Sequence, residues 1–166
     1  MSDRTRGRAS RFGVALVASI TLLAFTGAVA RAAIFAYESS ASAAFLGEIR
    51  KMKCKVKSTA KGKRFHAGGK TVNGAYGLNI NILKFKGFHQ YTVPFGVLSP
   101  EVSFEGIAND RDYSNVFPFP GGTPPPGGAG VIDFFGHGAR VGLGIYGLPN
   151  RDYSQGVALS GNAKCT

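Results

Sequence analysis

The side chains with the clearest potential for binding chemistry are a run of cations in residues 50–64. This stretch carries eight positive charges and no acid. Four of its lysines alternate with Met52, Cys54 and Val56, which is the pattern of a β-strand with one wet face and one buried face. Lysines on the same face of a strand lie about 7 Å apart, so they can meet successive anionic groups. The candidate anion-binding residues are Arg50, Lys51, Lys53, Lys55, Lys57, Lys61, Lys63 and Arg64.

Two interpretations of these cations are open. In the first, they bind an anionic envelope or extracellular polymer, or lipid headgroups. In the second, they are solvated charges that protect an edge strand from pairing with other chains. Most are lysines, which lack the planar fork of arginine, and no aromatic side chains are interleaved with them. Sequence-specific nucleic-acid recognition is therefore not expected.

The chain has only two cysteines, Cys54 and Cys165, which are 111 positions apart. In an exported protein such a pair favours a structural disulfide over a catalytic or metal-binding pair. The bond would place the lysine-rich strand beside the C-terminal segment. Everything between the two cysteines would then fold as one closed unit.

Catalytic chemistry has few candidates in this chain. The three histidines, His66, His89 and His137, are scattered and lack the spacing of a zinc site. No Gly-x-Ser-x-Gly motif is present. His137 stands between two glycines, four residues after Asp133, and a hydrolase-type enzyme using this pair is the alternative function. A non-catalytic protein is favoured, with no catalytic residues assigned.

Carboxylates offer neither a metal site nor a glycosidase pair. Asp110, Asp112 and Asp152 supply hard oxygen ligands, but the residues that follow do not continue a calcium loop. Glu101 and Glu105 would lie about 13 Å apart on one side of a strand, too far for glycoside hydrolysis. No metal and no other cofactor is predicted.

The N-terminal residues 1–32 are typical of a signal peptide. Four arginines within the first eleven residues precede an uncharged apolar stretch at 12–30, and alanines at 28, 30 and 32 fit an Ala-x-Ala cleavage pattern. We expect a secreted or cell-surface protein. The alternative is an uncleaved membrane anchor formed by residues 12–30.

Residues 33–166 are expected to form a single β domain. After removal of the leader, 15 Lys and Arg remain against eight Asp and Glu, a formal net charge of +7. Short alternating segments separated by Gly or Pro predict an all-β fold, an antiparallel β-sandwich or partly open barrel of about 7–9 short strands. Residues 33–48 predict one short strand and a loop, and residues 58–70 an exposed turn. Further strands are expected at 78–82, 85–93, 102–104, 113–118, 130–136, 139–148 and 154–161.

Two further features concern the second half of the chain. Residues 117–130 are rich in Pro and Gly and predict either an exposed loop or a projecting arm that presents Phe117 and Phe119 to a partner. Arg-Asp-Tyr-Ser occurs at 111–114 and again at 151–154, which a duplicated hairpin would explain. The Gly-rich segment 141–147 leaves a third function open, a structural envelope component whose strands pack closely in an assembly.

Overall fold

The computed structural model describes residues 32–108, 111–117, 128–151 and 153–166. They belong to one compact unit, Arg31–Thr166. The expected signal segment therefore lies outside the described residues except for Ala32, and so does most of the 117–130 loop. Every regular element in the described part is a β-strand, which confirms the all-β class. None of the described residues forms a helix long and apolar enough to cross a membrane.

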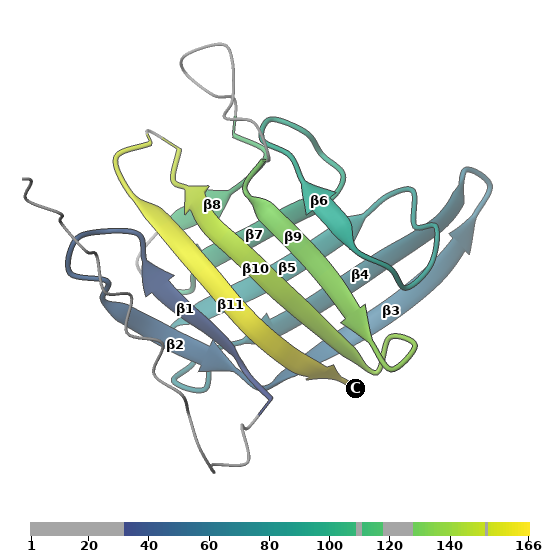
Figure 1. The fold of residues 1–166 in the computed structure, drawn as a ribbon, viewed down its shortest axis with the longest axis horizontal. Helices are drawn as coiled ribbons and strands as arrows, with labels where there is room; N and C mark the ends of the chain where they lie inside the picture. The colour runs from purple at the N-terminus through teal and green to yellow at the C-terminus, as the bar shows by residue number, and fades with distance from the viewer. Residues whose placement is uncertain (1–31, 109–110, 118–127, 152) are drawn as a thin grey trace, which may run out of the picture. The chain divides into compact units, whose positions relative to one another are not determined.

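Eleven strands make up the described part of the domain. They are β1 (Ile34–Glu38), β2 (Phe45–Ile49), β3 (Lys51–Thr59), β4 (Gly62–Lys70), β5 (Tyr76–Ile82), β6 (Tyr91–Val93), β7 (Glu101–Gly106), β8 (Asp112–Ser114), β9 (Gly130–Phe135), β10 (Arg140–Pro149) and β11 (Gly156–Cys165). They join in one curled sheet with the order β6-β9-β10-β11-β3-β4-β5-β7-β8, while β1 and β2 branch from β11. Figure 1 shows β9, β10 and β11 crossing over β3, β4 and β5, so the sheet folds back over itself.

The sheet differs from the expected one in strand count and in direction. Eleven strands replace the predicted 7–9, because residues 33–48 contribute to two strands and residues 58–70 contain the whole of β4. The sheet is also mixed and not purely antiparallel, since β11 runs parallel to β3 where Lys164 and Cys165 face Lys51 and Met52. Alternation reports which face of a strand is buried, but it carries no information about the direction of a distant neighbour.

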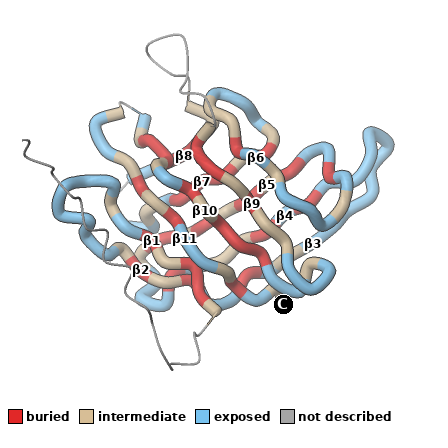
Figure 2. Tube along the Cα trace, viewed as in Figure 1, coloured by how far each residue is buried: buried red, intermediate tan, exposed pale blue. Residues whose placement is uncertain are grey.

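The hydrophobic core lies between the two halves of this curled sheet (Figure 2). In β5 burial alternates along the whole strand, and Leu78 and Ile80 are fully buried. Phe65 of β4 meets Phe134 of β9 edge to face, with ring centroids 4.9 Å apart. Burying each such side chain contributes about 1.5–3 kcal/mol relative to exposure, so the alternating pattern drives the two halves together.

The predicted disulfide is present. Cys54 and Cys165 are bonded with their Cα atoms 5.3 Å apart. Next to the bond, the backbone N–H of Thr166 donates to the carbonyl of Met52 at 2.9 Å. The bond therefore closes the sheet where its first and last long strands meet, as the positions of the two cysteines predicted.

The two Arg-Asp-Tyr-Ser copies lie next to each other in the described structure. Tyr113 of the first copy forms an antiparallel bridge with Asn150, which immediately precedes the second. The first copy follows the expected hairpin, because Asp112–Ser114 returns along β7. In the second copy Tyr153 precedes β11 and has a positive φ of 60°, while Asp152 lies outside the described residues.

Tyr113 is expected to make the protein less stable at alkaline pH. Burial raises the pKa of its phenol above 10.0, while the nearby Arg111 guanidinium opposes the shift. Because the folded-state pKa is raised, the contribution of Tyr113 to the free energy of unfolding is complete below the unfolded-state pKa. It is lost as the pH rises through the folded-state pKa. Urea unfolding at several pH values above about 9 should show a steeper loss of stability in the wild type than in Tyr113→Phe. Parallel curves would contradict this expectation.

Candidate anion-binding face

The register of β3 with β4 places five of the predicted cations on one face of the sheet. Lys57 lies opposite Arg64, Lys55 opposite His66 and Lys53 opposite Gly68. Because side chains alternate along a strand, Lys51 shares this face with Lys53. All four lysines and Arg64 are exposed to solvent. We call this surface, together with His66 and Lys70 of β4, the basic face.

The other three predicted cations are not part of the basic face. Arg50 precedes β3 and forms an ion pair with Glu48. Lys63 lies opposite Ser58 and so has the parity of buried Phe65, on the other side of β4. Lys61 stands in the turn between β3 and β4. The run of charge in the sequence therefore overstates the number of cations that can meet one ligand.

Two members of the basic face, His66 and Lys70, were missed by the sequence reasoning. Both belong to β4, whose Gly and Lys content predicted a turn. The signal that would have identified the strand is the alternation of Phe65 and Ala67, which are buried, with exposed Arg64 and His66. A strand that is polar on one face and contains two consecutive glycines is hard to separate from a turn by composition alone.

Within the part of the chain that the structure describes, no ion pair involves a cation of the basic face. Within the described parts of the chain the ion pairs are Arg50 with Glu48 and Arg111 with Glu38, both away from this face. The lysines of β3 are exposed to solvent and take part in neither of these ion pairs. Such groups can bind an anion without first breaking a contact within the protein.

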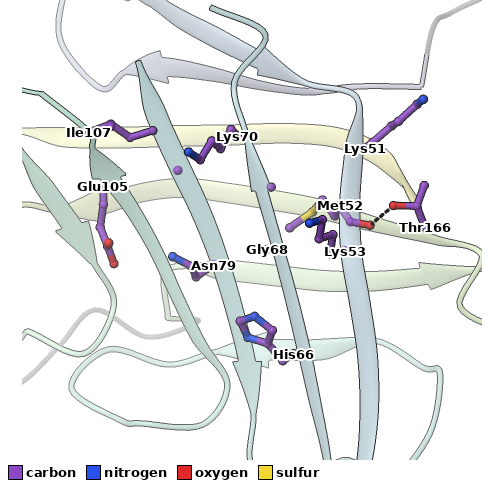
Figure 3. A pocket seen from close by; sticks show the side chains of 13 residues that line it. Lys51, Met52, Lys53, His66, Gly68, Lys70, Asn79, Glu105, Ile107 and Thr166 are labelled. Carbon is purple, nitrogen blue, oxygen red and sulfur yellow. Dashed lines mark hydrogen bonds between the residues drawn. The ribbon is translucent and has the colours of Figure 1, made fainter. Parts of the chain in front are cut away.

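A groove about 740 Å³ in volume opens beside these cations (Figure 3). Its floor is low because Gly68 of β4 and Gly77 of β5, which face this side of the sheet, have no side chains. A Cβ atom built on Gly77 would meet nothing within 4 Å, so this glycine faces open space. The groove is lined by Lys51, Met52, Lys53, His66, Gly68, Gly69, Lys70, Gly77, Asn79, Glu105, Gly106, Ile107 and Thr166.

Charge changes sign from one side of the groove to the other. Lys70 of β4 lies opposite Gly77 of β5, and Gly77 lies opposite Glu105 of β7. Neighbouring strands are about 4.8 Å apart, so the Cα atoms of Lys70 and Glu105 are separated by about 10 Å. Ser103 donates a hydrogen bond of 2.9 Å to Oε1 of Glu105 and thereby orients the carboxylate.

The end of the groove nearest His66 is organised by hydrogen bonds between strands. His66 Nδ1 and Asn81 Oδ1 are 2.8 Å apart, and Asn81 Nδ2 donates to Glu101 Oε2 at 3.1 Å. Since Asn81 accepts with its oxygen, Nδ1 of His66 carries the proton in this contact. The chain of contacts holds the imidazole in place beside Gly68.

The alternative catalytic pair takes a different arrangement. His137 has a φ of 54° in the exposed turn between β9 and β10. Asp133 accepts a hydrogen bond from Gln90 Nε2 at 2.9 Å, and no hydrogen bond joins it to His137 within the described residues. The same part of the chain contains no group of three or more His, Cys, Asp or Glu side chains able to hold a metal. Asp110 and Asp152 lie outside it.

Comparison with protein-family models, with curated proteins and with solved structures finds no match for this chain.

Proposed function

We propose that this chain is an exported, non-catalytic protein that binds an anionic envelope or extracellular polymer through the basic face. The observation that carries the proposal is the set of exposed cations on β3 and β4, which form no ion pairs with other described residues. The N-terminal segment 1–32 then serves as the signal for export. The Cys54–Cys165 bond supports this location, because structural disulfides persist in oxidising compartments.

The spacing of the cations suits a polymer better than a single small anion. Lysines along β3 repeat about every 7 Å, and β4 adds a second row of basic side chains about 4.8 Å away. An exposed ion pair contributes only about 0.2–1 kcal/mol, so useful affinity requires several contacts at once. A chain with repeated negative charges can make these contacts with little additional loss of translational freedom.

Replacing Lys51, Lys53, Lys55 and Lys57 with Gln is expected to weaken binding to an immobilised anionic polymer by at least about tenfold at low salt. Affinity of the wild-type protein should also fall steeply as ionic strength rises. Retention on dextran sulfate and on polyphosphate, measured over a salt gradient, provides the comparison. Unchanged retention of the quadruple variant would rule the proposal out.

Two double variants distinguish the effect of the basic face on binding from the effect of the protein's net charge. Lys53→Gln with Lys55→Gln removes two charges from β3, while Lys84→Gln with Lys86→Gln removes two exposed charges from the loop after β5. The first pair should lower retention markedly and the second only slightly. Equal losses would show that overall charge, and not the basic face, holds the polymer.

Protection of an open strand edge is the competing explanation of these lysines. β3 pairs with β4 from Lys53 to Thr59 and with β11 at Lys51 and Met52, and no other described strand pairs with the rest of this second edge. If edge protection is the role, the quadruple variant should self-associate in light scattering, while the wild type should bind no anionic polymer. Vesicles containing anionic lipid test the remaining alternative, binding to headgroups.

A further inference from the structure

The groove beside the basic face has the dimensions and the mixed chemistry of a sugar-binding subsite. Its volume of about 740 Å³ lies within the range of small-molecule sites, about 300–1,000 Å³. It lies on the outer face of β3, β4, β5 and β7 and joins the row of lysines, so a chain bound along β3 could place one of its units there. This inference rests on the proposed binding of an anionic polymer.

Glu105 indicates what kind of polymer would fit. A chain that is negatively charged on every side, such as polyphosphate, would bring like charge against this exposed carboxylate. A sugar hydroxyl can instead donate a hydrogen bond to it, and bonds to charged groups are the stronger kind. Asn79, on the strand between, offers an amide that both donates and accepts.

The opposite wall is complementary to the acidic substituent of such a sugar. Lys53 and Lys70 line the groove on the β3 and β4 side, and Glu105 lines it on the β7 side (Figure 3). No ion pair joins Lys70 to Glu105 within the described residues. Ile107, about half exposed beyond the end of β7, adds apolar surface for the C–H groups of a ring.

We propose that the groove binds one unit of an acidic polysaccharide, with its carboxylate or sulfate on Lys53 and Lys70 and its hydroxyls on Glu105 and Asn79. The polymer recognised by the basic face is then an acidic glycan, and not a polyphosphate or a nucleic acid. Gly77 is the specificity-determining residue, because its missing side chain leaves the space that the sugar occupies.

The test uses the exported chain and compares two acidic glycans that keep free hydroxyls, oligogalacturonate and chondroitin sulfate, with inorganic polyphosphate by calorimetry at fixed salt. Gly77→Val fills the groove with a side chain suited to a strand, and its Cβ meets nothing within 4 Å. We expect this variant to bind both glycans about tenfold more weakly and polyphosphate about equally. The control is Gly147→Val on β10, whose Cβ would meet only Ser39 Oγ, at 3.7 Å.

A second variant tests the groove without changing its volume. Glu105→Gln keeps the size of the side chain but removes the charge, so affinity for the glycans should fall several-fold while affinity for polyphosphate should rise. In the contrary outcome, all three polymers bind through the β3 lysines while Gly77→Val has no effect on any of them. That result would overturn the proposed subsite but leave the proposed function standing. Binding of none of the three would contradict the proposed function itself.

Discussion

Replacing Cys54 and Cys165 together with serine is expected to lower the free energy of unfolding by about 2–5 kcal/mol. The bond links residues 111 positions apart, and so long a loop gives a large loss of chain entropy when it is closed in the unfolded state. In the folded state it joins β3 to β11, whose direct pairing covers only Lys51–Lys164 and Met52–Cys165. Without the bond, few contacts hold this junction between the two halves of the sheet.

Equilibrium unfolding in urea, without reductant, measures the effect. The double variant avoids leaving one reactive thiol, and it should be insensitive to added reductant. The wild type in reductant should approach the stability of the double variant. A change of less than about 1 kcal/mol would show that the β3–β11 junction is stable without its covalent link.

Asn115→Ala is expected to lower the free energy of unfolding by about 3–5 kcal/mol. Asn115 is fully buried, and its Oδ1 accepts a 2.7 Å hydrogen bond from the backbone N–H of Val102. Its Nδ2 donates to the carbonyls of Pro94 and Pro100 at 2.7 and 2.9 Å. One side chain therefore satisfies the backbone of the β6–β7 connection, and truncation leaves several buried groups without partners.

Two comparisons make this result specific. Asn115→Asp keeps the size but places a carboxylate where the amide donated to two carbonyls, so it should destabilise at least as strongly as the alanine variant. Asn79→Ala, on the outer face of β5, should change stability by no more than about 0.5 kcal/mol. Equal effects at the two asparagines would mean that the hydrogen bonds of Asn115 contribute little beyond those made with water in the unfolded chain.

Several features of the fold follow from local sequence pattern. Alternation of apolar and polar residues in β3 and β5 predicts strands with one buried face, and both strands are present. Burial alternates along the whole of β5, whereas on the apolar side of β3 Met52 is buried, Cys54 is half-buried and Val56 is exposed. The exposure of the β3 lysines and the Cys54–Cys165 bond were also predicted. These features depend on a period of two residues or on the only possible pairing of two cysteines, so they can be read without knowledge of the neighbouring strands.

The basic face was predicted in part. Four of its five lysines lie on β3 and share a parity, which local alternation predicts. Lys63 is close to them in sequence, but its parity places it on the other side of β4. Lys70 is not among the predicted cations, because the two glycines before it make its strand resemble a turn in the sequence. The groove was not predicted, because Gly77, Asn79 and Glu105 come together only when β4, β5 and β7 pair in one particular register.

The sequence by itself determined the all-β class, the buried and exposed faces of the clearest strands, and the covalent link between the lysine-rich strand and the C-terminus. Only the tertiary structure decided the strand order, the parallel approach of β11 to β3, the buried role of Asn115 and the opposition of Lys70 to Glu105 across Gly77. The physical reason is that burial periodicity is a local property of a strand. Register between strands depends instead on the packing of a core that is assembled from the whole domain.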